Sequence, residues 1–461
     1  MEDIFALLAD ICGENSVFTD EEHLRDYEQD QTLNLRYAFD ILVKPGSPEE
    51  IAGILRICNQ YKIPVTPRGG GSGVTGGALP VMGGVVLSLE KLNKIISINK
   101  EELYVIAESG VVTDDLRKAV KECDLYFPVF PSSSSYSFVG GNVAENAGAI
   151  NSCKFGSLSN YVLNLEVVLP TGEIIWTGAN VTKSSAGLNI TRVFVGSEGV
   201  LGVITKIVFR LLPAYLPEMI FLAAFDNLEN ACKAVLKIKA SRLFPSAVEL
   251  IRKNAISVTA AFLNEPLPLV TENVEAILLL GLQEYHPEIL QSSMNDLFML
   301  LSEYTDSEIL VGETESEKAR LTRLRLNVGN AMTSNKGYYR DIDACVPLTE
   351  LYGYIKKVEC LCFENGFSLA CFGHAMDGNM HTMILLKEGD DTDRLHKLNG
   401  VVREIYTYAL SLGGVISGEH GIGILQKEYM RIQYTTDQLD LMKRFKLLFD
   451  PNGILNPGKL F

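Results

Sequence analysis

The length, composition and charge of this chain exclude several classes of protein. With 461 residues, 47% of them hydrophobic, the chain can form two domains or one large two-lobed enzyme with a packed core. Acidic residues outnumber basic ones by 57 to 41, and the net charge of −16 argues against binding to nucleic acid or to an anionic membrane surface. The first residues lack the pattern of a signal peptide, and no window approaches the ~18 apolar residues of a membrane span, so we expect a cytoplasmic protein.

The nine cysteines are distributed along the chain without a CxxC pair. Pairs at that spacing are typical of thiolate metal sites and iron–sulfur clusters, and neither is expected here. We expect most of the cysteines to be reduced residues of the core.

The first part of the chain alternates short strands with turns. Residues 41–43 and 63–66 have the pattern of strands, and the capping box at 47–50 starts a helix between them. A further helix is expected at 113–123, followed by a hairpin around 170–172. The pattern predicts an α+β domain over residues 1–212.

Longer helices dominate after residue 213. The apolar pattern predicts them at 227–240, 286–301, 348–363 and 393–412, with strands between them. We therefore expect a second α+β domain over residues 213–414. No repeat, low-complexity tract or flexible linker separates the two parts, so we expect them to share an interface of the kind where ligands often bind.

A glycine-rich segment follows the second strand directly. Residues 68–77, RGGGSGVTGG, contain six glycines and two small hydroxyl residues, so successive backbone N–H groups can approach a phosphate closely. The alternative interpretation is a structural turn, because glycine clusters also form bulges and corners. A strand-like segment at 84–87 follows the loop instead of a helix, which excludes a Rossmann fingerprint or a P-loop.

Two later segments have the same character. Residues 131–135, PSSSS, lead to the glycines of 140–142, and residues 194–199, FVGSEG, lead to a strand-like run at 202–205. Three glycine- and serine-rich loops in one domain suggest one long ligand.

All three segments, in this order and spacing, resemble the FAD-binding domain of the vanillyl-alcohol oxidase superfamily, also called PCMH-type. The resemblance covers residues 15–461 and is closest to the branch of D-lactate dehydrogenase, the glycolate oxidase flavin subunit and D-2-hydroxyglutarate dehydrogenase. It implies a two-lobed fold with an FAD domain, an α+β substrate or cap domain, and a C-terminal segment, residues 415–461, that returns to the FAD domain and completes the active site. The residues that it places along FAD are Arg68, Gly69, Gly70, Gly71, Ser72, Gly73, Thr75, Gly76, Pro131, Ser132, Gly140, Gly141, Asn142, Ala144, Gly148, Glu198, Gly202 and Ile204.

Two details of the loops qualify the resemblance. Members that attach FAD covalently often carry a histidine in the first loop, whereas this loop has Ser72 and Gly73, so we expect non-covalent FAD. The segment Gly148-Ala149-Ile150-Asn151 stands where close relatives often have a second glycine and a proline, which puts the immediate surroundings of the flavin in doubt.

The sharpest local pattern is CFGHAMDGNMH at 371–381, in which Asp377-Gly378 is a strong two-residue hairpin signal. A two-residue turn would place His374 directly opposite His381, with Cβ atoms roughly 5 Å apart, so that both rings could bind one metal ion. The alternative is a hydrogen-bonded pair of core histidines. Of the six histidines in the chain, three lie in this hairpin or in the later segment SGEHG at 417–421.

The resemblance assigns roles to these residues. His374, His381 and Glu419 would bind a divalent ion, for which two imidazoles and one carboxylate suit Zn²⁺ best, with Mn²⁺ or Fe²⁺ as alternatives. Such a metal would bind the substrate carboxylate and hydroxyl and lower the hydroxyl pKa. His420 would be the general base, because an imidazole titrates near working pH.

A cation is expected opposite the substrate carboxylate. In the family an arginine precedes the aspartate of a later strand, and Arg325 holds that place relative to Asp343. Its planar guanidinium could bind a carboxylate with two parallel hydrogen bonds. A surface arginine is the alternative interpretation, and the competitors are Arg320, Arg323 and Arg340.

The sequence thus predicts an FAD-dependent dehydrogenase that oxidises a small D-2-hydroxy acid to the 2-oxo acid by hydride transfer to flavin N5, with assistance from a metal. An oxidase that uses O₂, or a flavin subunit of a larger electron-transfer complex, are the alternatives. The electron acceptor could be a quinone, a cytochrome, an electron-transfer flavoprotein or an iron–sulfur subunit, and a partner could hold the protein peripherally at a membrane. A homodimer is compatible with the sequence, and Arg340 or Lys336 could recognise a second substrate carboxylate.

Overall fold

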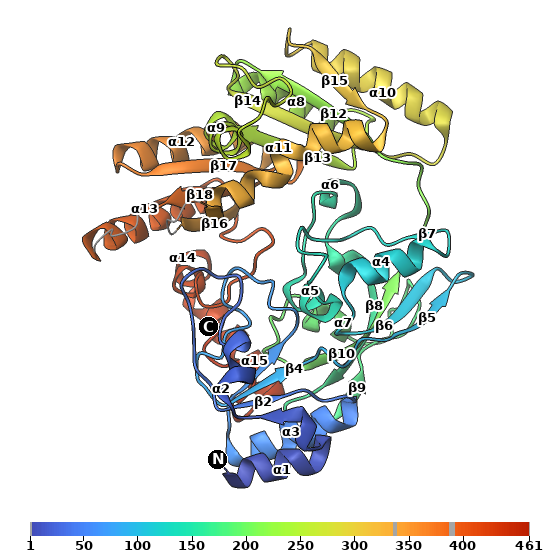
Figure 1. Cartoon of the computed structure of the whole chain (residues 1–461), viewed down its shortest axis with the longest axis vertical. Helices are drawn as coiled ribbons and strands as arrows, with labels where there is room; N and C mark the ends of the chain where they lie inside the picture. Colours follow the sequence, from blue (N-terminus) through green and yellow to red (C-terminus); the bar gives the residue numbers. More distant parts are fainter. Residues whose placement is uncertain (1, 335–338, 387–391, 461) are drawn as a thin grey trace. The chain divides into compact units, whose positions relative to one another are not determined.

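The computed structural model describes residues 2–334, 339–386 and 392–460, and its helices and strands are shown in Figure 1. The chain divides into two compact units. Unit 1 comprises Met1–Ala149, Gly156–Ala214 and Glu419–Phe461, and unit 2 comprises Ile150–Phe155 and Tyr215–Gly418. The short segment Ile150–Phe155 therefore packs with unit 2, although the sequence places it within the first domain.

The first sheet of unit 1 has the strand order β1-β2-β4-β3. Strands β2 and β3 both pair with β4 in parallel, and apolar residues of these strands form a core with helices α1 and α3. Helix α3 begins as expected, because the side chain of Ser47 accepts a hydrogen bond from the backbone N–H of Glu50 and Pro48 lies in the first turn. The bounds are α1 Glu2–Cys12, β1 Val17–Phe18, β2 Ile41–Val43, α3 Pro48–Tyr61, β3 Val65–Arg68 and β4 Val85–Ser88.

The second sheet of unit 1 is antiparallel, with the order β5-β6-β10-β8-β9. Strands β8 and β9 form the hairpin that the sequence predicts around residue 171. The strand bounds are β5 Ile95–Asn99, β6 Tyr104–Glu108, β7 Leu125–Tyr126, β8 Val162–Val168, β9 Ile174–Trp176, β10 Val203–Arg210 and β11 Leu212–Pro213, of which β7 and β11 pair separately. The remaining helices of this unit are α2 Glu21–Leu24, α4 Thr113–Lys121, α5 Val139–Glu145, α7 Ile190–Phe194, α14 Met430–Gln433 and α15 Thr436–Phe449, with 3₁₀ turns at Glu14–Ser16, Arg25–Tyr27, Leu158–Asn160 and Lys427–Tyr429.

The C-terminal residues Glu419–Phe461 belong to unit 1. They return to the first sheet, where Val65 of β3 forms a parallel bridge with Leu455 and donates its N–H to the carbonyl of Ile454 at 2.8 Å. Helix α15 begins with a complete capping box between Thr435 and Gln438.

Unit 2 is built on one sheet of seven strands in the order β15-β12-β14-β13-β17-β18-β16. All neighbouring strands in it are antiparallel. The strand bounds are β12 Met219–Phe225, β13 Ala247–Arg252, β14 Ala276–Leu282, β15 Ile309–Gly312, β16 Tyr339–Cys345, β17 Ser368–His374 and β18 Asn379–Leu385.

Helices cover both faces of this sheet (Figure 1). Helices α9 and α11 contact one face, where apolar residues of both helices and of strands β12, β13, β14, β17 and β18 form a core. Helices α8, α10, α12 and α13 contact the sheet from the other face. The helix bounds are α6 Ser152–Phe155, α8 Leu228–Ala240, α9 Lys253–Leu263, α10 Pro287–Ser302, α11 Glu315–Ser334, α12 Leu351–Glu364 and α13 Thr392–Ser411, with 3₁₀ turns at Leu348–Glu350 and Ala375–Asp377.

Two expectations from composition can be compared with the structure. No helix in the described part of the chain is both long enough and apolar enough to cross a membrane. All nine cysteines are free thiols, and only Cys360 among them is exposed.

Candidate functional site

The two histidines of the hairpin lie on one face of the unit 2 sheet. His374 ends β17 and His381 lies in β18, and both side chains are buried. Their ring centroids are 5.4 Å apart and the ring planes meet at 88°. The structure therefore brings together the two imidazoles that the sequence singles out.

The predicted register of this hairpin is wrong by two residues. His374 pairs with Asn379, and His381 pairs with Phe372, so the two histidines are diagonal neighbours rather than directly opposed. The cause is a longer loop: residues 375–377 form a 3₁₀ turn, and Gly378 follows with φ of 70°. Because side chains alternate along a strand, a shift of two residues keeps both rings on the same face.

The sequence gives no indication of Glu249, which the structure places beside His374. Strand β13 pairs Glu249 with His374, and its Oε1 lies 2.5 Å from His374 Nδ1. Its other oxygen, Oε2, accepts a hydrogen bond of 2.6 Å from Arg325 Nε. Burial acts to raise the pKa of Glu249, but the charges and hydrogen bonds of His374 and Arg325 outweigh it and lower the pKa to about 2. A carboxylate on Nδ1 fixes the ring and directs Nε2 outward.

Arg325 lies on the inner face of α11 and not on the surface. Its guanidinium is 4.9 Å from the ring centroid of Phe372, and its Nε–H is the group bound to Glu249. Of the competitors, Arg320 and Arg323 are exposed. Arg340 pairs with Ile384. Successive residues of a strand point to opposite faces, and Ile384 is an odd number of residues from His381 in β18, so Arg340 faces the opposite side of the sheet from His381. Lys336 lies outside the described residues.

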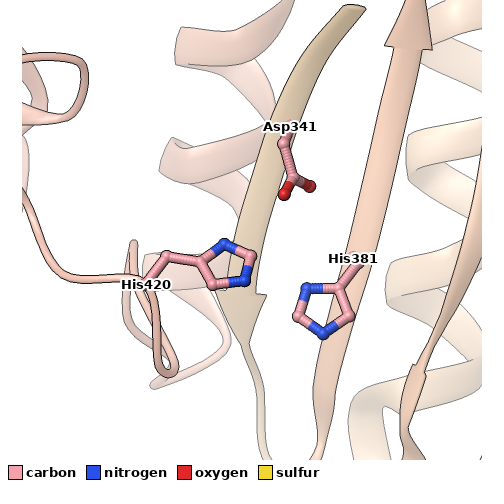
Figure 2. Close-up of side chains that lie close together, drawn as sticks. All are labelled: Asp341, His381 and His420. Atoms are coloured by element: carbon pink, nitrogen blue, oxygen red, sulfur yellow. The ribbon is translucent and has the colours of Figure 1, made fainter. Parts of the chain in front are cut away.

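Two aspartates of β16 lie on the histidine face. Asp343 pairs with His381 and is fully buried, and its carboxylate accepts hydrogen bonds from Asn379 Nδ2 at 2.8 Å, Ser417 Oγ at 2.9 Å and the Gly418 N–H at 3.0 Å. Asp341 is two residues earlier in the same strand. Figure 2 shows Asp341 and His381 on two strands that lie side by side. A carboxylate oxygen of Asp341 lies within 4.8 Å of a ring nitrogen of His381.

In unit 1 the three predicted loops meet. A Cβ added to Gly69 would lie 3.6 Å from the Cα of Gly141, which places the first and second loops side by side. The N–H of Glu198 donates to the carbonyl of Ala144 at 2.8 Å, which joins the third loop to the second. Gly202 and Ile204 follow at the start of β10, where Ile204 pairs with Val167.

Several side chains assigned to the cofactor are engaged within the protein. The buried guanidinium of Arg68 donates to the backbone carbonyls of Asp26, Tyr27 and Gln29, so it holds the N-terminal segment. Asn142 donates to the hydroxyl groups of Thr113 and Ser137.

Glu198 holds the segment that follows His420. Its carboxylate accepts hydrogen bonds from the N–H groups of Ile422 at 2.8 Å and Gly423 at 2.7 Å, and its own φ of 50° is in the left-handed region. Burial raises the pKa of Glu198, although these two N–H groups and Lys459 act in the opposite direction. A residue held in such a conformation is a sign of a constrained site.

The first glycine loop also contacts this segment. Thr75 Oγ1 donates to the carbonyl of His420 at 3.2 Å, and the Thr75 carbonyl accepts from the N–H of Ile424 at 2.9 Å. Glu419 and His420 are therefore the first two residues of a C-terminal segment that is fixed within unit 1 by both Thr75 and Glu198.

Comparisons with known proteins agree with this architecture. Residues 39–178 match the model of the FAD binding domain, and residues 217–460 match the C-terminal domain of FAD linked oxidases. These matches define the class as an FAD-binding oxidoreductase. The chain belongs to the family of FAD-linked oxidases.

The relatives cover almost the whole chain. The chain is 33% identical to glycolate oxidase subunit GlcD of Bacillus subtilis over 94% of this chain and 92% of that protein. It is 34% identical to D-lactate dehydrogenase of Anaerostipes hadrus, with 91% and 89% covered. Among solved structures, p-cresol methylhydroxylase has the same fold, with a TM-score of 0.82 at 18% identity over 100% of this chain and 96% of that one.

Proposed function

We propose that this chain is an FAD-dependent dehydrogenase that oxidises a small D-2-hydroxy acid, of the D-lactate, glycolate or D-2-hydroxyglutarate class, to the 2-oxo acid. The observation that carries the proposal is the pair of buried imidazoles on one sheet face, with Glu249 orienting His374 and Arg325 beside it. The names of the relatives, glycolate oxidase subunit and D-lactate dehydrogenase, support the substrate class.

The loops of unit 1 fit FAD through their backbone. A Cβ at Gly73 or Gly141 would meet no atom within 4 Å, so a ligand can approach the chain closely at both positions. Backbone N–H groups in such loops suit a pyrophosphate. The first loop contains no histidine, and we propose that FAD is bound without a covalent bond.

The histidine face fits a divalent metal. Two imidazoles and one carboxylate leave open positions for a substrate, as in catalytic zinc sites. Chain connectivity supports Glu419 as the third ligand. Gly418 is bound to Asp343, the strand partner of His381, and the Cα of Glu419 can be no more than ~3.8 Å from that of Gly418.

In this proposal each residue of the site has its own role. His374, His381 and Glu419 hold the metal, and the guanidinium N–H groups of Arg325 beyond Nε bind the substrate carboxylate. His420 accepts the hydroxyl proton, and Thr75 and Glu198 hold the segment that carries it. When bound, the metal would lower the pKa of the substrate hydroxyl and FAD would accept the hydride from the α-carbon.

We also propose a separate electron acceptor, such as a quinone, an electron-transfer flavoprotein or an iron–sulfur subunit. The sequence has no CxxC motif that could build an internal iron–sulfur relay. In this proposal the protein is cytoplasmic, or is held at a membrane by its acceptor, and a homodimer is compatible with it.

Anaerobic addition of candidate substrates to the purified yellow protein tests the function. We expect glycolate or D-lactate to bleach the flavin absorbance, and L-lactate to have little effect. A protein that is colourless even after FAD addition, or that no 2-hydroxy acid reduces, would contradict the proposal. Peroxide formed in air in step with substrate oxidation would instead indicate an oxidase.

A further inference from the structure

Helix α15 presents a row of apolar side chains to the surface of unit 1. None of its residues is buried, and its exposed large apolar side chains are Leu441 (62%), Phe445 (39%), Leu447 (53%) and Leu448 (74%). Leu441, Phe445 and Leu448 follow one another at intervals of four and three residues, so they form one stripe along the helix. Side chains at this spacing are those by which one helix packs against another.

Another side of α15 holds the helix on unit 1. The ammonium group of Lys446 donates to the backbone carbonyls of Val200 at 2.7 Å and Leu455 at 2.8 Å. The ring of Phe449 packs edge-on against that of Phe194, with the centroids 5.5 Å apart. The helix is therefore anchored without the stripe, and the stripe is left for another partner.

Exposed charges flank the stripe in a defined order along the helix. Asp437 and Asp440 lie in the first half of α15, and Lys443 and Arg444 lie in the second half. Asp437 and Arg444 are seven residues apart, so both lie on the same side of the helix, next to the stripe. Asp440 and Lys443 are 3.8 Å apart, and each side chain is about half exposed. The two acidic and two basic side chains cancel in charge.

This surface is complementary to itself. When two α15 helices lie antiparallel about a twofold axis, the stripes face each other and the acidic half of each helix faces the basic half of the other. In a parallel pair, like charges would be side by side. An anionic membrane surface is a poorer partner, because the four charges of the helix cancel and the whole chain carries a net charge of −16.

We propose that the exposed face of α15 is a docking surface for a second copy of this chain, which it binds as an antiparallel pair of α15 helices. This inference goes beyond the proposed function and does not depend on it. Two helices of 14 residues bury less surface than a standard protein interface, so the dimer is expected to be reversible, with a dissociation constant in the micromolar range.

Analytical ultracentrifugation of the FAD-loaded protein over a series of concentrations measures the dimer. We expect wild type to pass from monomer to dimer at micromolar concentrations. Leu448→Asp places a charge in the stripe and should weaken dimerisation by about 10-fold or more, and Leu441→Asp is a second variant in case the first folds poorly. The matched control is Phe363→Asp, since Phe363 is an 84% exposed apolar residue of helix α12 in unit 2. This control should leave the dissociation constant unchanged.

Exchange of the charges tests the antiparallel order. Asp437→Lys combined with Asp440→Lys makes the exposed charges of both helices basic, and repulsion should weaken the dimer by about 10-fold or more. Adding Lys443→Asp and Arg444→Asp restores opposite charges in reversed order, and the dimer should return. Far-UV circular dichroism and FAD content show that each variant is folded.

Three results would overturn the inference. One is a wild type that stays monomeric at every concentration, including one that binds anionic vesicles as a monomer. Another is a dimer that neither stripe variant weakens. The third is a folded fourfold charge variant that does not recover the dimer. None of these results affects flavin bleaching by a 2-hydroxy acid, so the proposed function is tested separately.

Discussion

At the scale of single residues, Glu249 connects Arg325, the proposed substrate-binding cation, to His374, a proposed metal ligand. Its two oxygens are divided between Arg325 Nε and His374 Nδ1, and the side chain is fully buried. Carboxylates behind metal-bound histidines fix the ring and its tautomer. Glu249 is thus expected to act through His374 and Arg325 and not by touching the substrate.

We predict that Glu249→Gln weakens metal binding about 10-fold to 100-fold, because the amide no longer gives His374 an ionised partner. The measurement is metal affinity by calorimetric titration of the FAD-loaded protein. Glu359→Gln is the control, since it removes a different carboxylate of unit 2, partly buried, that pairs with an arginine, Arg252, at 2.8 Å. Equal metal affinity in Glu249→Gln and wild type would refute this role.

Sequence reasoning finds the histidines and misses Glu249 for a physical reason. His374, His381 and the Glu419-His420 pair stand in short glycine-containing motifs that turn chemistry alone makes visible. Glu249 is a single acidic residue within an apolar strand, and only its pairing with β17, more than a hundred residues later, brings it to His374. Such long-range pairing leaves no local pattern. The sequence also shows the glycine-rich loops that we expect around FAD. It does not show that the Arg68 side chain forms hydrogen bonds within the protein.

At the scale of elements, the hairpin of β17 and β18 determines the histidine geometry. Period-two alternation places His374 and His381 on one face for any loop with an even number of residues, whereas the exact register depends on a loop conformation that the sequence Asp377-Gly378 leaves open. The loop requires glycine at 378: φ is 70°, and a Cβ there would overlap the carbonyl oxygen of Val346.

We predict that Gly378→Ala destabilises the protein by more than ~1 kcal/mol and weakens metal binding, because alanine is strained at positive φ and displaces Val346. Far-UV circular dichroism during urea unfolding and a metal titration measure the two effects. Gly400→Ala is the control in the same unit. Gly400 lies inside helix α13 with nothing within 4 Å of an added Cβ, so this change should stabilise by about 0.5–1 kcal/mol. A Gly378→Ala protein as stable as wild type would contradict the loop conformation.

At the scale of the whole molecule, the charge buried in unit 1 links stability to pH. The pKa of Glu145 is raised well above its ordinary value of 4.5 by burial and by the charges of Glu198 and Asp30. Its Oε2 is buried without a hydrogen-bond partner among the described residues. Folding therefore disfavours the ionised form of Glu145. As pH rises from the pKa of this carboxyl in the unfolded state toward its higher pKa in the folded state, the free energy of unfolding falls.

We predict that Glu145→Gln and wild type have equal free energies of unfolding near pH 4. Above pH 4 the variant should be more stable than wild type, and the difference should grow by at most ~1.4 kcal/mol for each pH unit until the pKa of Glu145 in the folded state is reached. Trp176 is the only tryptophan and lies in β9 of unit 1, so its fluorescence during urea unfolding at saturating FAD reports on the unit that contains Glu145. A difference between the two proteins that does not change with pH would contradict the assignment.

The central claim is that a flavin and a metal site on one chain together oxidise a 2-hydroxy acid. Anaerobic single-turnover reduction tests it most directly, with the same FAD-loaded protein measured before chelation, after chelation and after metal is restored. We predict that D-lactate or glycolate bleaches the flavin rapidly before chelation, at least 100-fold more slowly after it, and rapidly again once Zn²⁺ or Mn²⁺ is returned. Equal bleaching with and without metal, or no bleaching in any of the three samples, would contradict the account.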